Sequence, residues 1–204
     1  MPSQRPTREA LSYPGVGFLV VVSAPSGGGK TTVLKRILER SEGTFCYSIS
    51  ATTRQPRVNE VDGRDYHFFS LEEFHRRIAA NAFIEYAEVH GNMYGTPRQA
   101  VADWIQQGKI VLLDLDVQGG INVKEQLGEK ALLIFIKPPT LETLRQRLLS
   151  RNTDSPAEIT ARLQAAEKEL AFAQRYDQVI VNQNLDKTVD EVLTIIANYR
   201  TIPL

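Results

Sequence analysis

The sequence predicts an α/β fold in which helices cover both faces of a parallel sheet. Three observations indicate it: apolar runs of strand length recur along the chain, segments with helical start signals separate them, and a glycine-rich loop follows the first run. Alternating strands and helices are typical of parallel sheets, because each crossover lays a helix on a sheet face. A chain of 204 residues can form one such domain with inserted parts.

The elements are expected in a regular order that one segment interrupts. Strands are predicted at 18–22, 45–50, 65–69, 83–89, 110–115, 131–136 and 178–181, and helices at 30–40, 71–80, 97–108, 120–127, 141–149, 156–174 and 188–200. Capping boxes are predicted at Ser70, Thr96 and Ser155, each followed three residues later by Glu or Gln. Residues 51–97 break the rhythm and are expected to form a small α+β insertion, and residues 1–16 a flexible tail.

Composition excludes several classes of protein. The 24 basic and 24 acidic residues balance, so no overall field favours nucleic acid or an acidic membrane surface. The single cysteine, Cys46, cannot form an internal disulfide, and the three histidines have no metal-ligand spacing. No apolar run approaches the ~18 residues of a membrane span, and residues 1–16 lack the apolar segment of a signal peptide. A cytoplasmic protein without a membrane or nucleic-acid partner is expected.

The glycine-rich loop predicts a nucleoside triphosphate site. It reads APSGGGKTT between a strand and a helix, and it matches the pattern G-x-x-x-x-G-K-[ST] except that Ala24 replaces the first glycine. Glycines let backbone N–H groups close around phosphate oxygens, and the helix N-terminus adds positive potential. Lys30 is expected to reach the β- and γ-phosphates and Thr31 to offer its hydroxyl to Mg²⁺. The alternative is an ordinary glycine-rich turn.

Two groups of residues in or beside the insertion point to a nucleotide acceptor. Arg54 and Arg57 flank a proline, with Tyr66 nearby in sequence, and paired guanidinium groups suit a phosphate monoester, although a solvated loop is the alternative. Glu85 lies within an apolar run and, with Ser50 and Thr96, suits guanine: a carboxylate can accept from N1–H and the exocyclic amine, whereas adenine has no proton at N1. Alone, Glu85 would read as the outward face of a half-exposed strand.

Two further groups fit phosphoryl transfer. Asp114 and Asp116 end a buried strand, where an acid commonly helps to hold Mg²⁺, often through water; the alternative is a carboxylate that caps the next turn, and spacing does not separate their roles. Arg147 and Arg151 lie four residues apart on one helical face, and Arg162 follows a polar hinge. They suit a lid that closes over phosphates, or alternatively a solvated helix surface.

Taken together, these motifs resemble the guanylate kinases over about residues 17–200. The matching segments are SAPSGGGKTT, SATTRQPR, DYHFF, FIEYAEVHGNMYGT, LLDLDVQGG, RQRLLSRNTDS and VIVNQNLD. A P-loop is shared by many nucleotide enzymes, whereas TTRxPR followed by E…GNxYGT is much more specific. The sequence departs from the family pattern at Ala51, Asn59, Met93, Gln183 and Asn184, and none of these departures removes a candidate site residue.

The resemblance implies an ATP:GMP phosphotransferase that uses Mg²⁺, yields ADP and GDP, accepts dGMP as well, and closes on its substrates. It implies a core of 17–50, 98–147 and 167–204, a GMP-binding insertion of about 51–97 and a lid of about 148–166, within one domain of 17–204. The implied catalytic residues are Lys30, Arg54, Arg147, Arg151 and Arg162. Those for ATP are Ala24, Pro25, Ser26, Gly27, Gly28, Gly29, Lys30, Thr31, Thr32 and Asn182. Those for GMP are Ser50, Arg54, Arg57, Tyr66, Glu85, Tyr94, Thr96 and Asp116, and those for the metal are Thr31 and Asp114.

Two other functions stay open at this stage. A guanylate-kinase-like scaffold keeps the fold and binds phosphopeptides without catalysis, but such domains typically lose the P-loop lysine and lid arginines that are present here. A related P-loop kinase could phosphorylate another acceptor, such as a ribose phosphate. Glu85, Ser50 and Thr96 favour guanine over that acceptor. The sequence does not indicate an oligomeric state.

Overall fold

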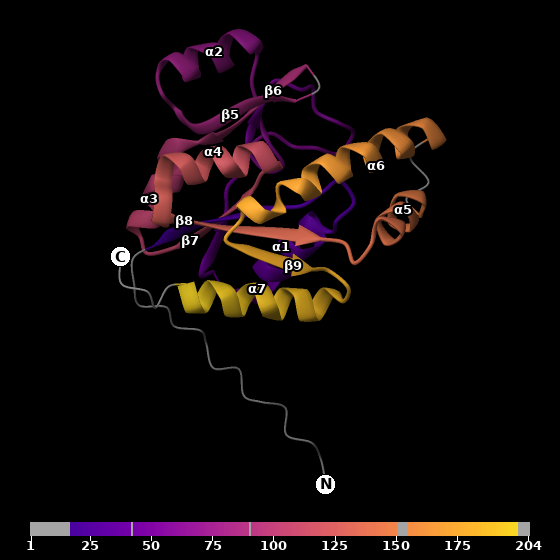
Figure 1. Cartoon of the computed structure of the whole chain (residues 1–204). Coiled ribbons are helices and arrows are strands. Elements are labelled where there is room, and N and C mark those ends of the chain that lie inside the picture. Colours follow the sequence, from indigo (N-terminus) through magenta and orange to yellow (C-terminus); the bar gives the residue numbers. More distant parts are fainter. Residues whose placement is uncertain (1–16, 42, 90, 151–154, 200–204) are drawn as a thin grey trace.

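A computed structural model describes residues 17–41, 43–89, 91–150 and 155–199 (Figure 1). Its centre is a five-stranded parallel sheet in the order β2-β7-β1-β8-β9. The strands are β1 (Phe18–Ser23), β2 (Phe45–Tyr47), β7 (Ile110–Asp114), β8 (Ala131–Lys137) and β9 (Gln178–Val181). The tail expected at 1–16 lies outside the described residues.

The central strand β1 is buried on both faces, which explains its unbroken apolar sequence. Val20 lies opposite Leu112 of β7 and Leu132 of β8. Alternate residues of β1 enter two core clusters, one with helices α1 (Lys30–Arg40) and α7 (Leu185–Tyr199), the other with α3 (Arg98–Gln106) and α4 (Val117–Leu127). Helices therefore cover both faces of the parallel sheet, as predicted.

A second sheet is formed within residues 51–97. Its order is β4-β3-β6-β5, from strands β3 (Ala51–Thr52), β4 (His67–Phe68), β5 (Phe83–Val89) and β6 (Asn92–Pro97). Helix α2 (Leu71–Ala79) packs on this sheet through Phe74, which stacks on Phe83 with ring centroids 4.5 Å apart. Figure 1 shows this sheet and helix on one side of the five-stranded sheet, with β5 beside α4.

Helices α5 (Leu141–Leu149) and α6 (Pro156–Ala171) form a separate pair at the carboxyl end of the central sheet (Figure 1). They pack through Leu144, Leu148, Ile159 and Ala166. The capping box predicted at Ser155 is present: the Ser155 hydroxyl accepts from the Glu158 N–H, and the Glu158 carboxylate accepts from the Ser155 N–H. Short 3₁₀ turns at Gly128–Lys130 and Ala173–Arg175 complete the elements, so α6 ends three residues before the predicted boundary.

Two predicted helix starts were wrong, and one predicted capping box is incomplete, although its helix begins at Leu71 as expected. Thr96 does not cap a helix, because β6 runs through Pro97, the Thr96 hydroxyl bonds Glu85, and α3 begins at Arg98. The box at Ser70 is half formed, since Ser70 accepts from the Glu73 N–H while the Glu73 carboxylate pairs with Arg76 and Arg77. Helix α7 begins at Leu185 rather than residue 188.

Two further boundaries differ from the prediction, at the end of β2 and at the start of α4. The strand predicted at 45–50 ends at Tyr47, and Ala51–Thr52 of the expected polar loop instead joins the second sheet beside Gly95 and Tyr94. Helix α4 starts at Val117, before the predicted Gly120, because the Asp116 carboxylate caps it by accepting from the Gly119 N–H at 2.7 Å. Within the described ranges, no helix is long and apolar enough to cross a membrane.

Candidate functional site

The loop between β1 and α1 has the geometry of a phosphate cradle. Gly27 and Gly29 adopt φ angles of +88° and +98°, which L side chains rarely reach, and the Gly28 N–H closes a turn onto the Pro25 carbonyl at 2.7 Å. A Cβ added at Gly29 would overlap the Asn182 side-chain nitrogen. These glycines are therefore required by backbone conformation and by close packing. The loop lines a cavity formed by 24–32 together with Asp116 and Glu169.

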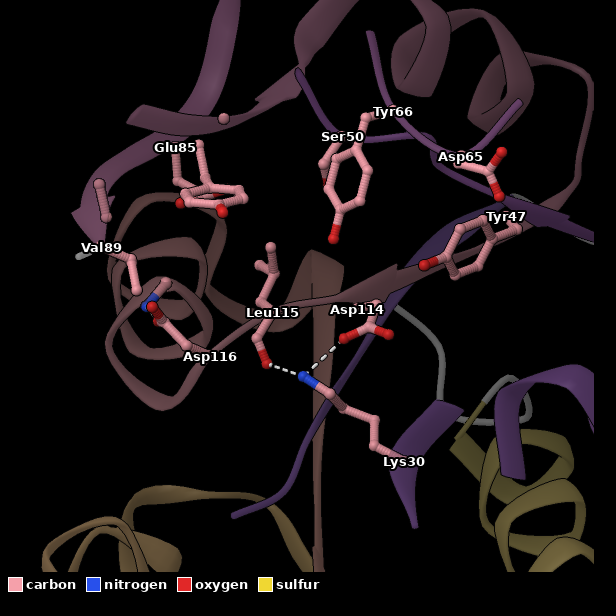
Figure 2. Close-up of a pocket in the computed structure, with 14 residues that line it drawn as sticks. Lys30, Tyr47, Ser50, Asp65, Tyr66, Glu85, Val89, Asp114, Leu115 and Asp116 are labelled. Carbon is pink, nitrogen blue, oxygen red and sulfur yellow. Dashed lines mark hydrogen bonds and ion pairs between the residues drawn. The ribbon is translucent and has the colours of Figure 1, made fainter. Parts of the chain in front are cut away.

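Lys30 lies where this cavity meets a second one. Its ammonium group pairs with the Asp114 carboxylate and donates to the Leu115 carbonyl at 2.6 Å, at the end of β7 (Figure 2). Lys30 and Asp116 line both cavities. The predicted metal residue Asp114 thus holds the P-loop lysine in this structure, while Thr31 lies exposed in the phosphate cavity.

The second cavity has a volume of about 220 Å³ and lies between the two sheets. It brings together five of the eight residues expected to bind GMP, among them two tyrosines and two carboxylates. These are Ser50, Tyr66, Glu85, Tyr94 and Asp116. Figure 2 shows Glu85 and Asp116 on one side of this space and Tyr47 on the other.

Glu85 is the buried carboxylate of the second cavity, with 6% of its surface exposed. The hydroxyl of Thr96, itself 1% exposed, donates to Glu85 Oε1 at 2.7 Å. Burial raises the pKa of Glu85 to about 7; the Thr96 hydrogen bond opposes this and the charge of Asp116 adds to it. Glu85 is therefore not a solvated residue on the outer face of a strand. Thr96 contributes to the second cavity indirectly, by bonding Glu85.

Arg54 contacts Tyr66 and Tyr94, two of the residues that line the second cavity. Its guanidinium group lies 5.4 Å from the Tyr66 ring centroid and pairs with Glu60 at 2.9 Å. The hydrogen bond to Glu60 raises the Arg54 pKa, and one to Tyr94 contributes as well. Glu60 also accepts a hydrogen bond from the backbone N–H of Arg57, which is exposed on the loop. The Glu60 carboxylate thus joins the two arginine positions.

The arginines of α5 and α6 contact the P-loop directly. Arg147 donates to the Gly28 and Asn182 carbonyls at 3.4 and 2.7 Å, and Arg162 donates to the Ser26 hydroxyl at 3.0 Å. Arg151 lies outside the described residues. Arg145 pairs loosely with Glu142 on the surface of α5.

Asn182 is buried behind the loop. Its amide nitrogen donates to the Gly28 carbonyl at 3.0 Å, and its amide oxygen accepts from Thr188 at 3.2 Å. Both ends of the amide are therefore used inside the protein to hold the P-loop against α7. A contact of Asn182 with ATP stays a prediction.

Tyr47 and Glu169 also line the cavities, although sequence reasoning did not predict either as a site residue. Tyr47 lies beside Asp114 in the second cavity; burial raises the pKa of Tyr47, and the charge of Asp114 and a hydrogen bond to it add to the effect. Glu169 of α6 lines the phosphate cavity. Neither carried a signal, because Tyr47 belongs to an apolar strand and Glu169 to a helix rich in Glu and Lys.

Comparisons with known proteins agree with this geometry. The family model described as guanylate kinase matches residues 17–199. The chain belongs to the guanylate kinase family. The guanylate kinase of Chlorobaculum tepidum is 49% identical over 187 residues, which cover 92% of this chain and 95% of that protein. The guanylate kinase of Clostridium perfringens strain 13 is 44% identical over 180 residues, 88% and 82% of the two chains.

A solved guanylate kinase has the same fold. The crystal structure of guanylate kinase from Anaplasma phagocytophilum superposes with a TM-score of 0.77 at 36% identity, covering 93% of this chain and 89% of that one. The fold class predicted from the sequence and the resemblance to guanylate kinases are thereby confirmed. The functional roles of individual residues stay predictions.

The residues around the phosphate cavity fit a magnesium ion that arrives with a nucleotide. Within the described part of the chain no group of three or more His, Cys, Asp or Glu side chains could hold a metal ion by itself. Mg²⁺ usually binds through one or two protein oxygens together with substrate phosphates and water. Thr31 and the buried, unpaired oxygen of Glu169 offer such oxygens in this cavity, and Asp114 offers another beside Lys30 in the second cavity.

Proposed function

We propose that this member of the guanylate kinase family transfers the γ-phosphate of ATP to GMP and releases ADP and GDP. The observation that carries the proposal is the meeting of two cavities at Lys30 and Asp116. One cavity is a P-loop suited to a triphosphate, and the other contains a buried carboxylate, hydroxyls and tyrosines suited to a purine monophosphate. A single lysine between them can contact the phosphoryl group as it passes from donor to acceptor.

Guanine recognition is assigned to Glu85. An ionised Glu85 can accept from N1–H and the exocyclic amine of guanine, and the Thr96 hydroxyl orients the carboxylate through Oε1. Adenine would place a lone pair against the carboxylate. A site with buried polar groups can reject the wrong base by about 10⁴-fold. Ser50 and Asp116 line the same cavity and complete the proposed base site.

The acceptor phosphate is assigned to Arg54, Arg57, Tyr66 and Tyr94. Arg54 stacks against Tyr66 and is held by Glu60, so its guanidinium group is oriented before substrate binds. The GMP phosphate is already anionic, so transfer needs positioning and charge stabilisation rather than a strong base. Lys30 supplies charge on the donor side, and Arg147, Arg151 and Arg162 are proposed to neutralise the moving phosphoryl group.

Thr31 and Asp114 are the proposed magnesium residues. When bound with ATP, Mg²⁺ would neutralise charge on the β- and γ-phosphates. The ion pair between Asp114 and Lys30 then has to be exchanged, because both side chains are needed at the nucleotide. This exchange fits the proposed division into a core, a GMP-binding insertion at 51–97 and a lid at 148–166 that close together. Turnover of dGMP and a cytoplasmic location are part of the same proposal.

The test is conversion of GMP to GDP with ATP and Mg²⁺, followed by separation of the nucleotides. Wild-type protein is expected to form ADP and GDP in equal amounts. Lys30→Ala should lose about 10²–10³ in kcat, as when one transition-state donor is removed, while exposed Lys35→Ala serves as the matched control. Normal turnover by Lys30→Ala would refute the role of Lys30, and absence of GDP with wild type would favour a phosphopeptide-binding scaffold.

A further inference from the structure

The phosphate cavity contains a carboxylate that the proposed reaction has not used. Glu169 lies on α6 and lines the same cavity as the P-loop residues 24–32. It lies seven residues, about two helical turns, after Arg162, so both side chains are on one face of α6. Arg162 bonds the Ser26 hydroxyl, and the Ser26 N–H faces the Glu169 carboxylate. One P-loop residue therefore contacts a cation and an anion of the same helix.

Glu169 Oε2 is a buried oxygen without a partner. Among the buried side-chain nitrogen and oxygen atoms of the described residues, it alone has no hydrogen-bond partner. Buried polar atoms are nearly always paired, so an unpaired one in a ligand cavity calls for an explanation. Burial raises the pKa of this carboxyl group, while the Ser26 N–H and the charge of Lys30 lower it and Asp116 raises it.

A ligand bound in the phosphate cavity determines whether Glu169 Oε2 gains a hydrogen-bond donor. A triphosphate carries acceptor oxygens and negative charge, so bare ATP next to Glu169 is repelled and offers no proton to its free oxygen. The magnesium complex of ATP carries two more positive charges and water molecules that donate hydrogen bonds. Lys30 does not supply a hydrogen bond to the free oxygen of Glu169 in the observed arrangement, because its ammonium group contacts Asp114 and Leu115.

We propose that Glu169 is a specificity-determining residue of the ATP site, which favours the magnesium complex of ATP over free ATP by offering its unpaired carboxylate oxygen to the hydrated cation. This inference rests on the proposed function, because it assumes that the P-loop cavity binds ATP. It assigns to α6 a second task besides carrying Arg162. A residue that only held Ser26 in place would affect both forms of ATP equally.

The test measures binding of a non-hydrolysable ATP analogue by calorimetry, with Mg²⁺ and with EDTA, in the absence of GMP. The ratio of the two dissociation constants is the readout. In Glu169→Gln this ratio is expected to shrink about tenfold, since hydrogen bonds to a charged group are worth roughly that factor or more. Exposed Glu167→Gln on the same helix should keep the wild-type ratio.

An unchanged ratio in Glu169→Gln overturns the inference. If both forms of ATP are weakened equally, the ratio stays the same and Glu169 only holds Ser26 in place. Glu169→Ala is the second variant if Glu169→Gln does not fold, and it is expected to shrink the ratio as well. GMP phosphorylation by wild type is measured in parallel. Active wild type with an unchanged Glu169→Gln ratio refutes this inference alone, whereas inactive wild type refutes the proposed function.

Discussion

The hydroxyl of Thr96 donates a 2.7 Å hydrogen bond to Glu85 Oε1 in the wall of the second cavity. Both side chains are almost completely buried, although they belong to different strands of the small sheet. Strand β5 supplies the carboxylate, and the last part of β6 supplies the hydroxyl that orients it. A buried carboxylate held in this way is suited to read a base edge rather than to bind a metal ion alone.

Glu85→Gln is expected to lower kcat/KM for GMP by about 10–100-fold, because the amide cannot accept from two guanine donors as a carboxylate does. Steady-state kinetics with GMP as the varied substrate measures this loss. Exposed Glu88→Gln on the same strand is the matched control and should behave like wild type. An equal loss in both variants would show that the change acts on the strand and not on guanine.

The affinity for GMP should increase between pH 6 and pH 8. The Glu85 pKa is raised from 4.5 to about 7, so between these two pH values the folded protein holds a proton there that the unfolded chain has lost. Guanine binding needs the ionised form, and below the pKa each pH unit is expected to cost about tenfold in affinity. GMP titrations of wild type and Glu85→Gln at several pH values separate this effect from ionisation of the GMP phosphate, which is common to both.

The same shift has a consequence for stability. A carboxyl group whose pKa is raised on folding stabilises the protein fully below pH 4.5 and loses that contribution as pH rises through about 7. The free energy of unfolding of the unliganded wild type should therefore decrease over this window more than that of Glu85→Gln. Identical pH profiles in denaturant unfolding would contradict the assigned pKa.

Arg54→Lys should reduce kcat/KM for GMP by about 10–100-fold, since lysine lacks the planar fork that binds phosphate at two points. Arg54 is held by Glu60 and by the Tyr66 ring, and a lysine cannot keep that arrangement. Arg64→Lys is the comparison, because Arg64 is 63% exposed and pairs with its neighbour Asp65. If the two variants were equally active, Arg54 would have no role at the acceptor phosphate.

Gly29→Ala and Gly43→Ala distinguish close packing from backbone strain. Both glycines have positive φ angles, +98° and +83°, so alanine costs each about 1–2 kcal/mol in the left-handed region. Only at Gly29 does the added Cβ overlap Asn182, whereas nothing lies within 4 Å at Gly43. Thermal unfolding should show the larger loss for Gly29→Ala, and its affinity for ATP should fall about tenfold or more as phosphate hydrogen bonds are lost. Equal effects would show that Asn182 does not restrict the loop.

Local signals predicted the main elements well where one interaction dominates. The alternation of apolar runs and helices indicated the parallel sheet, and Ser155 with Glu158 marked the start of α6. The two carboxylates at the end of β7 allowed two interpretations. Of the alternatives for its two carboxylates, Asp116 takes the capping role at α4, while Asp114 pairs with Lys30.

Prediction failed where tertiary contacts or overlooked caps decide the outcome. Thr96 matches a helix cap in sequence, yet its hydroxyl is used by Glu85 from the neighbouring strand. Helix α7 starts at Leu185 because the Asn184 side chain accepts from the Lys187 N–H, a cap that was overlooked. Glu169 resembles any surface acid of α6 until the fold places it in the phosphate cavity.

The most direct test of the account is a panel of acceptors with ATP and Mg²⁺: GMP, dGMP, AMP, UMP and a ribose bisphosphate. Because Glu85 is proposed to read N1–H and the exocyclic amine, kcat/KM for GMP should exceed that for AMP by about 10⁴. Turnover of dGMP is expected as well, and the ribose bisphosphate should be inactive. Equal or faster turnover of an acceptor without guanine would contradict the assignment of the second cavity to GMP.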